Sequence, residues 1–221
     1  MMKKVVVIAA AGKGSRLGAG KPKCLIEVNN HALFEYQLRA FSWADEIRMV
    51  VGYQAEEVME RVKRINPDVK FVINKDYDTT KTLQSNFLGV KGITNKTLFI
   101  DGDMIISKQT ADNLKNAYED GEEFVGVASD ISEEPVYACV EEQQVRWFNY
   151  DRVALNEWAN VALLEPDKLE YLPTHFFVQI EKFLPLKAVE VERLEIDTKE
   201  DLVHAETIVR EQFEKYNYWM E

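Results

Sequence analysis

The chain has 221 residues, of which 46% are hydrophobic, and this size and composition predict a globular protein with one large core. A net charge of −11 argues against duplex nucleic acid as a partner, because non-specific binding needs a basic surface. Two cysteines, and no apolar run near the ~20 residues of a membrane span, predict a cytoplasmic protein that does not depend on disulfides or contact a membrane.

The first distinctive stretch is an apolar run over residues 5–11 that leads into Gly12-Lys13-Gly14-Ser15-Arg16. An uninterrupted apolar run predicts a buried parallel strand, and this one is too short and too soon followed by glycines for a signal peptide. Glycines beside basic side chains are typical of a loop that binds phosphate. Residues 1–23 hold six basic residues and no acidic one, on a chain that is otherwise acidic.

Two common phosphate-binding motifs do not fit this loop. Leu17 stands where the dinucleotide-binding fingerprint needs its third glycine. Gly14 follows Lys13 where the phosphate loop of ATPases needs serine or threonine. An ordinary strand-to-helix turn with surface lysines therefore remains an alternative on this evidence.

Extended and helical patterns alternate along the first half of the chain. This alternation predicts an α/β protein with a doubly wound parallel sheet, in which ligands bind at the carboxyl ends of the strands. The expected strands cover residues 25–28, 47–51, 69–73 and 98–100, and the expected helices cover residues 31–42, about 58–65 and 85–89.

The second half has a different rhythm, with a helix over residues 112–118 followed by several short strands. Thr198 is expected to open a last helix with Asp201 in a capping box. No repeat or linker is visible, which predicts a single domain over residues 1–221. The expected strands are 124–128, 137–140, 145–148, 158–164 and 189–191, one or two helices lie within 172–184, and the last helix is expected to bury Leu202, Ala205, Val209 and Phe213.

Two acidic segments follow predicted strands. Asp101-Gly102-Asp103 comes directly after one strand, and Asp197 follows the last one. Two carboxylates that meet near a phosphate site are what Mg2+ needs, because it takes oxygen ligands and bridges protein carboxylates to phosphates. The alternative is that Asp103 caps the next helix and Asp197 is a turn residue.

The order of these motifs resembles a known family. Residues 10–18 followed by Pro22-Lys23 are similar to the signature of the sugar-nucleotide-type nucleotidyltransferases. The resemblance continues through residues 34–38, 50–53 and 101–103, ends with residues 195–202, and is weak between residues 122 and 193. The compact chain looks most like the small bacterial choline-phosphate and phosphonate cytidylyltransferases.

This resemblance implies a three-layer α/β/α Rossmann-like fold with a mixed, mostly parallel sheet. Residues of about 1–120 and 194–221 would bind the nucleotide, and residues of about 121–193 would bind the acceptor. The residues that would bind the triphosphate, base and ribose are Ala10, Ala11, Gly12, Lys13, Gly14, Ser15, Gln84, Ser85, Asp101 and Gly102; Arg16 and Lys23 would be catalytic, and Asp103 and Asp197 would hold Mg2+.

The implied reaction joins CMP from CTP to a small phosphorylated or phosphonate acceptor, such as phosphocholine, and releases pyrophosphate. Positioning and charge neutralisation would do most of this chemistry, with no protein nucleophile. A sugar-1-phosphate uridylyl- or thymidylyltransferase, and a catalytically silent nucleotide sensor, remain alternatives. Thr82-Leu83-Gln84 stands where the family often has Asn-Asn before Ser85, so the choice of base is open. A homodimer is compatible with the sequence.

Aromatic and acidic residues gather in the part expected to bind the acceptor. Trp147, Tyr150, Asp151 and Trp158 would suit an ammonium head group through cation–π contacts and charge. The alternative is that these aromatic residues belong to the core.

Overall fold

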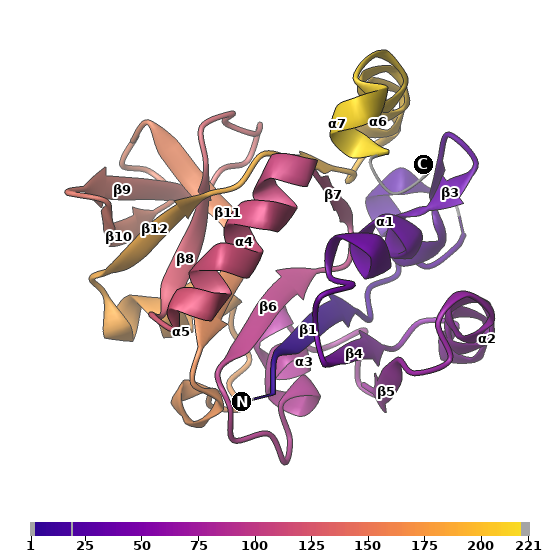
Figure 1. The fold of residues 1–221 in the computed structure, drawn as a ribbon, viewed down its shortest axis with the longest axis horizontal. Coiled ribbons are helices and arrows are strands. Elements are labelled where there is room, and N and C mark those ends of the chain that lie inside the picture. The colour runs from indigo at the N-terminus through magenta and orange to yellow at the C-terminus, as the bar shows by residue number, and fades with distance from the viewer. Residues whose placement is uncertain (1–2, 19, 218–221) are drawn as a thin grey trace.

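The computed structural model describes residues 3–18 and 20–217 and is organised around one twisted mixed sheet (Figure 1). Of the nine strands in the described part of this sheet, seven run in one direction, and β11 and β10 run in the other. The predicted α/β sheet with mostly parallel strands is therefore confirmed. The strand order is β5 (Lys70–Ile73), β4 (Glu46–Val51), β1 (Val5–Ala10), β6 (Thr97–Asp101), β11 (Asn156–Leu164), β8 (Phe124–Ala128), β12 (Leu186–Glu190), β10 (Gln144–Asn149) and β9 (Tyr137–Glu141).

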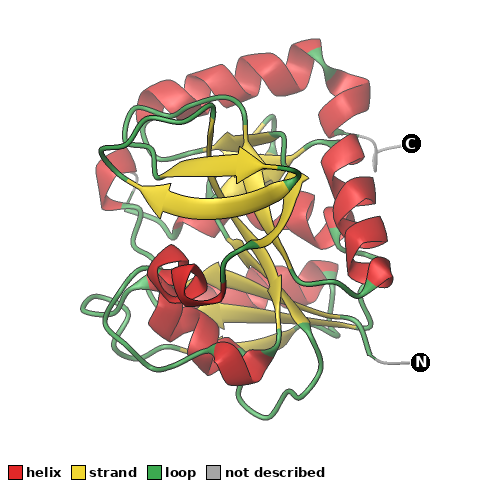
Figure 2. Cartoon of the chain, turned by 90° about the vertical axis from the view of Figure 1, so that its left-hand side faces the viewer, coloured by secondary structure: helices red, strands yellow, loops and turns green. Residues whose placement is uncertain are grey.

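Helices cover both faces of the sheet, which gives the three predicted layers (Figure 2). Alternate residues of β1 enter two different clusters, Val6 and Ile8 one of them and Val7 the other, because successive strand side chains point to opposite faces. The first face packs on α1 (Leu33–Ala40), α2 (Ala55–Ile65) and α4 (Lys108–Asp120), and the second on α3 (Thr82–Gly89) and α5 (Phe176–Ile180).

Short elements complete the chain. They are two small ladders, β2 (Glu27–Val28) with β3 (His31–Ala32) and β7 (Met104–Ile106) with β13 (Arg193–Glu195), the helices α6 (Lys199–Glu211) and α7 (Phe213–Tyr216), and the 3-10 turns η1 (Ser15–Leu17), η2 (Lys23–Leu25), η3 (Pro166–Lys168) and η4 (Glu181–Phe183). No helix within residues 3–18 and 20–217 has the length and apolar character needed to span a bilayer.

The end of the chain confirms one expectation and corrects another. The capping box of α6 is present: Thr198 Oγ1 accepts from the Asp201 amide at 3.1 Å, and Asp201 Oδ2 accepts from the Thr198 amide at 2.8 Å. The predicted burial of Phe213 is wrong, because this residue is 49% exposed. Its helical spacing from Val209 is lost because α6 ends at Glu211 and Phe213 begins a separate turn of helix, α7.

The sequence does not predict the β7–β13 ladder. Met104–Ile106 is a strand of only three residues, and its antiparallel partner lies almost ninety positions later in the chain. Local sequence carries no signal for a pairing this short and this distant. The ladder matters because it brings the segment after β13 against the segment after β6.

Glu46 on β4, the strand next to the sheet edge, is expected to make the stability of the fold depend on pH. Its buried carboxylate accepts from Lys70 Nζ and Arg48 Nε, both at 2.6 Å, and from Lys3. Burial alone would raise the pKa of Glu46, but these hydrogen bonds lower it to about 2. A folded-state pKa below the unfolded value of about 4.3 favours the ionised fold above pH 5, and this gain is lost as the pH falls toward 2.

We therefore expect Glu46→Gln to lower the free energy of unfolding at pH 7 by about 2 kcal/mol, a value reduced for the exposure of Lys3 and Lys70. In urea titrations between pH 7 and pH 3, the difference in the free energy of unfolding between Glu46→Gln and the parent protein should decrease once the pH falls below about 4. Glu60→Gln, at an exposed pair with Arg64 on α2, is the control and should change stability by under about 0.5 kcal/mol. A gap of constant size across this range would contradict the assignment.

Candidate functional site

The glycine-rich loop after β1 forms one wall of the site. Gly14 has a φ of 61°, in the left-handed region, and a Cβ there would lie 2.7 Å from Lys23 Cγ. Both constraints favour glycine, because other residues are strained at this φ. The loop then enters η1, whose Leu17 is buried and anchors it, while Lys13 and Arg16 remain exposed. The loop thus presents basic side chains from a fixed backbone.

Asp101-Gly102-Asp103 forms a second wall, between β6 and β7. The Gly102 amide donates to Ala9 O at 2.8 Å, and a Cβ on Gly102 would lie 2.8 Å from Ala10 Cβ. Glycine is therefore needed for the end of β6 to lie against the end of β1. This contact aims Asp103 toward the glycine-rich loop.

The third wall comes from the far end of the chain. The β7–β13 pairing places Glu195 opposite Met104, and the Ile196 amide donates to Asp103 O at 3.0 Å. Asp197 follows at once and is held by Asp201, whose Oδ2 accepts from the Asp197 amide at 3.0 Å. The α6 cap therefore also fixes the backbone of a predicted site residue.

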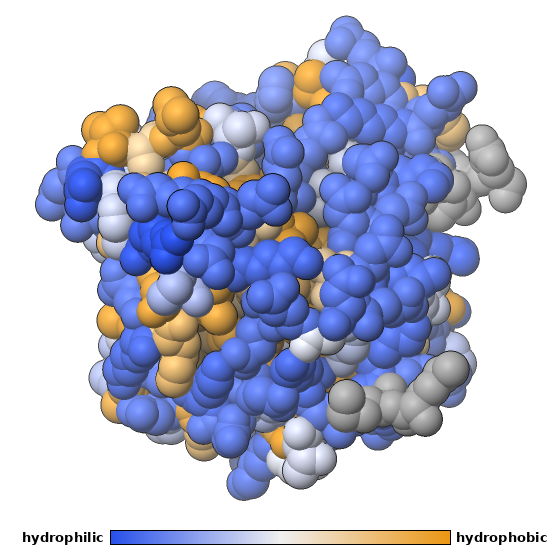
Figure 3. Space-filling view, turned by 60° about the vertical axis from the view of Figure 1, so that its left-hand side comes forward, coloured by the Kyte–Doolittle hydropathy of each residue, from blue (hydrophilic) through white to orange (hydrophobic). Residues whose placement is uncertain are grey.

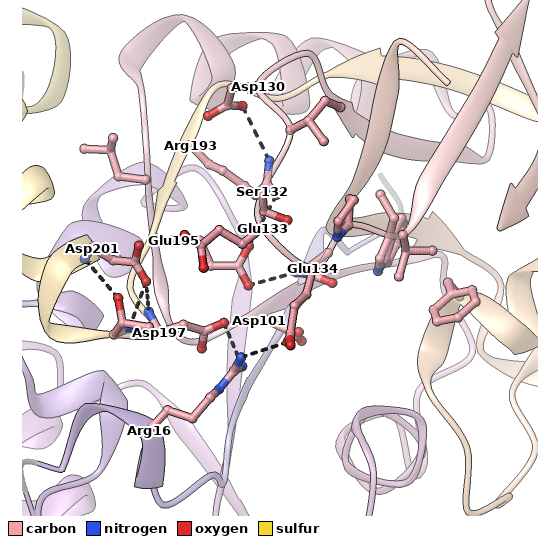
Figure 4. A pocket seen from close by; sticks show the side chains of 18 of the residues that line it. Arg16, Asp101, Asp130, Ser132, Glu133, Glu134, Arg193, Glu195, Asp197 and Asp201 are labelled. Atoms are coloured by element: carbon pink, nitrogen blue, oxygen red, sulfur yellow. Dashed lines mark hydrogen bonds and ion pairs between the residues drawn. The ribbon is translucent and has the colours of Figure 1, made fainter. Parts of the chain in front are cut away.

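Lys23 lies between two carboxylates from these walls. Its Nζ donates to Asp103 Oδ2 at 2.8 Å and also to Asp197. Burial alone would lower the pKa of Lys23, but the two carboxylates outweigh it and raise the pKa, so the ammonium stays charged. Arg16 Nη2 donates to Asp197 Oδ2 at 2.8 Å, as Figure 4 shows. The structure thus brings together four predicted residues, Arg16, Lys23, Asp103 and Asp197.

A carboxylate that sequence analysis did not single out joins them. Asp103, Glu195 and Asp197 each offer an oxygen, and these oxygens lie within 4.8 Å of one another. Burial and the neighbouring charge of Asp103 raise the pKa of Glu195 to about 7, and burial likewise raises the pKa of Asp101. Glu195 ends β13 and Asp197 follows two residues later, and this spacing of two acids was the signal available in the sequence.

This cluster fits a divalent cation. Asp103 Oδ1 is buried and has no hydrogen-bond partner in the part of the chain that the structure describes. Oxygen-only ligands of this kind suit Mg2+ better than softer metals. Asp103, Glu195 and Asp197 are the residues that could hold it.

Two adjoining cavities open on the site. The smaller, of about 210 Å3, lies between the glycine-rich loop, Asp101–Asp103 and the start of α3, and Ser85 lines it along with Ala10, Ala11, Gly12 and Gly14. Among the described residues, Lys13, Ser15 and Gln84 are not part of this lining. Gln84 Oε1 instead accepts from the Lys81 amide at 3.1 Å and caps α3.

The larger cavity, of about 1170 Å3, shares Asp101 with the smaller one. Its aromatic lining is Tyr150, Trp158, Phe176 and Phe177, and its acidic lining includes Asp130, Glu133 and Glu134. Figure 3 shows patches of hydrophobic surface between hydrophilic regions on one face of the molecule.

Of the four residues predicted at the acceptor site, two line the larger cavity. Tyr150 and Trp158 line the larger cavity, with rings packed edge-on to Phe177 and Phe176. Within the described ranges, Trp147 and Asp151 are not in this lining. Trp147 lies under the Arg152 guanidinium, 4.2 Å from the ring centroid, and Asp151 is exposed.

Asn160 is a further residue that sequence analysis missed. It lies inside β11 with a φ of 56°, where the β11–β8 register shifts between Trp158 and Ala162. A bulge of this kind re-aims a side chain, and here the amide lines the larger cavity and donates to Glu195 Oε1 at 3.4 Å. The signal in the sequence was one polar residue within an apolar strand.

Comparison with known proteins places this geometry in context. A family model described as MobA-like NTP transferase domain matches residues 6–152. Among curated proteins, the chain is 29% identical over 105 residues to the bifunctional protein GlmU of Aliarcobacter butzleri, covering 47% of this chain and 24% of that protein. It is 32% identical over 133 residues to 2-C-methyl-D-erythritol 4-phosphate cytidylyltransferase of Clostridium perfringens, covering 58% and 59%. The matches therefore span about a quarter of the GlmU proteins.

Solved structures share the fold over nearly the whole chain. CTP:phosphocholine cytidylyltransferase from Streptococcus pneumoniae superposes with a TM-score of 0.75 at 23% identity, covering 94% of this chain and 100% of that one. The inositol-1-phosphate CTP transferase from T. maritima gives 0.76 at 16%, covering 95% and 97%. A putative glucose-1-phosphate thymidylyltransferase from Bacillus anthracis gives 0.80 at 16%, covering 94% and 95%.

Proposed function

Because this chain belongs to the MobA-like NTP transferase family, we propose that it is a Mg2+-dependent cytidylyltransferase that joins CMP from CTP to a small phosphorylated acceptor. The observation that carries the proposal is the Lys23 ammonium, held between Asp103 and Asp197 where the two cavities meet. A cation at this junction can neutralise the α-phosphate of CTP while the acceptor approaches it from the other cavity.

The reaction forms one bond and breaks one. An acceptor phosphate or phosphonate oxygen attacks the α-phosphorus of CTP, and the bond to the bridging oxygen of the β-phosphate breaks, so pyrophosphate leaves. Lys23 neutralises charge at the α-phosphate, Arg16 contacts the β- and γ-phosphates, and the amides of Gly12–Ser15 surround the triphosphate. Asp103, Glu195 and Asp197 would hold Mg2+, which supplies further charge neutralisation to the phosphates.

The smaller cavity, of about 210 Å3, supports a site for a nucleobase beside the glycine-rich loop. Ser85 lines it, and its Oγ accepts from Asn74 Nδ2 at 3.1 Å, which leaves the hydroxyl hydrogen free to turn toward a base oxygen.

The larger cavity supports a cationic acceptor. Tyr150 and Trp158 line it together with Asp130, Glu133 and Glu134, and an ammonium group is attracted to both aromatic and acidic side chains. A primary or quaternary ammonium acceptor, such as phosphocholine or an aminoalkylphosphonate, has this chemistry.

A second candidate is transfer of a uridylyl or thymidylyl group to a sugar 1-phosphate. The observation in its favour is the size of the larger cavity, about 1170 Å3, which exceeds what a small ammonium acceptor fills. The fold shared with the putative glucose-1-phosphate thymidylyltransferase from Bacillus anthracis is compatible with this candidate.

One assay separates these candidates. The protein is incubated with each NTP, Mg2+ and a panel of phosphorylated acceptors, and pyrophosphate release is followed. We expect turnover with CTP and a cationic acceptor. Turnover with UTP or dTTP and a sugar 1-phosphate, but not with CTP, would refute the first proposal, and no turnover with any pair would leave a silent nucleotide sensor.

A further inference from the structure

Arg193, at the start of β13, lies buried between the two parts of the site. Its side chain is 4% exposed. Nη2 lies 2.5 Å from Glu157 Oε1 on one side and 3.3 Å from Glu195 Oε2 on the other, and Nη1 lies 3.8 Å from Asp130 Oδ1. One guanidinium therefore joins an acid of β11, an acid of the larger cavity and an acid of the metal-type cluster.

The Glu157 side of this network holds a loop. Residues 130–136, called here the cavity loop, line the larger cavity. The side chain of Glu157 is 2% exposed, and its Oε2 accepts from the Ser132 amide at 3.1 Å and from Ser132 Oγ at 2.8 Å. Farther along the loop, Glu134 Oε2 accepts from Arg16 Nη1 at 3.4 Å (Figure 4). The cavity loop is thus fastened at one point by Glu157 and at another by the glycine-rich loop.

The Glu195 side of the network holds a candidate metal ligand. Glu195 Oε2 accepts from Arg193, and Glu195 Oε1 accepts from Asn160. Because Asp103 and Asp197 lie on the remaining side, the orientation of Glu195 is defined by Arg193 and Asn160 together.

The burial of these charges indicates positioning rather than stability alone. A buried ion-pair network is often no more stable than well-packed hydrophobic residues, because each charge loses its hydration. Arg193 Nε and Nη1 are buried and have no hydrogen-bond partner among the residues described. Arg193 borders the larger cavity, but its side chain is only 4% exposed and its charged contacts within the described part of the chain are all to carboxylates, so its effect on the site passes through those carboxylates.

We propose that Arg193 is a positioning residue that couples the cavity loop to the Asp103–Glu195–Asp197 cluster. A shift of the loop when an acceptor enters displaces Glu157, and the shared guanidinium transmits that displacement to Glu195. The identity of the two ligands rests on the proposed function, whereas the coupling itself is a property of the free protein.

The first test replaces Arg193 with lysine, which keeps the charge but loses the planar guanidinium that lies between Glu157 and Glu195. Mn2+ affinity of the free protein, measured by electron paramagnetic resonance, should fall about tenfold, as is typical when an outer-shell partner is lost. Amide exchange at Ser132 should accelerate about tenfold. Arg48→Lys is the control, because Arg48, on β4, is another arginine paired with a buried glutamate, and its replacement should change both quantities by under twofold.

The second test removes the other end of the link with Glu157→Gln. Released from Glu157, Arg193 should pair more closely with Glu195 and draw it from the cluster, so Mn2+ affinity should fall about threefold although Glu157 is not in the cluster. In turnover, the acceptor KM should rise for both variants while the CTP KM stays within twofold. If Arg193→Lys does not fold, Glu157→Gln alone tests whether the cavity loop and the carboxylate cluster are coupled.

Unchanged Mn2+ affinity in Glu157→Gln, or equal losses in Arg48→Lys, would overturn the coupling. The Mn2+ and exchange measurements need no turnover. If the parent protein releases no pyrophosphate with CTP, the proposed function is refuted, but the coupling measured by Mn2+ affinity and amide exchange still stands.

Discussion

Replacing Asp103 with asparagine is expected to lower the rate of CTP-dependent pyrophosphate release about a thousandfold. Asp103 contributes an oxygen to the three-carboxylate cluster and also accepts from Lys23 at 2.8 Å. Loss of its charge weakens the binding of the divalent cation and the orientation of the Lys23 ammonium. A loss of several kcal/mol of transition-state stabilisation corresponds to a rate about a thousandfold lower. The measurement is the steady-state rate across a Mg2+ titration.

The control for this variant is Asp112→Asn. Asp112 is an exposed acid on α4 that pairs with Lys108 at 2.9 Å, and its replacement should leave the rate within twofold of the parent protein. The melting temperature of Asp103→Asn should remain close to that of the parent protein, because the lost group is a partly exposed site residue. Near-normal turnover in Asp103→Asn would show that the cluster does not hold the catalytic cation.

The second large effect is expected for Lys23→Met, with a loss of about a hundredfold in kcat. Preorganised charge at a phosphate that becomes more negative is worth about this much when one donor is removed. Lys23 is held by Asp103 and Asp197 and already aimed at the junction of the two cavities, so the variant should affect kcat more than the CTP KM.

Lys21→Met provides the matched control, because Lys21 is exposed and lies two residues earlier in the same loop. Its loss should raise the CTP KM by no more than a few-fold and leave kcat unchanged. Stopped-flow measurement of pyrophosphate release separates the two parameters. Equal effects of the two replacements would show that Lys23 contributes only to the general positive charge of the loop.

The sequence allows prediction of features that depend on local pattern. The buried strand before Gly12, the alternation that places Asp101–Asp103 at a strand end, and the cap at Thr198 each rest on neighbouring residues, and the structure contains all three. The roles assigned to these site residues stay predictions.

The remainder depends on pairings between distant segments. β11 runs against β6, so Val161 lies opposite Ile100 and the first half of β11, rather than its end, reaches the site. That reversal brings Trp158 and Asn160 to the cavity and leaves Trp147, on β10, outside it. A rule based on the carboxyl ends of parallel strands cannot anticipate a strand of opposite direction.

Asn160 also bears on how this protein could be engineered. A left-handed backbone inside a strand is unfavourable for asparagine and costs glycine nothing in sterics. A screen that ranks variants by thermal tolerance alone would therefore admit glycine at position 160 as harmless. The resulting chain would keep its fold and lose the amide that contacts Glu195, so selection for heat resistance alone would remove one of the two contacts that orient this candidate metal ligand.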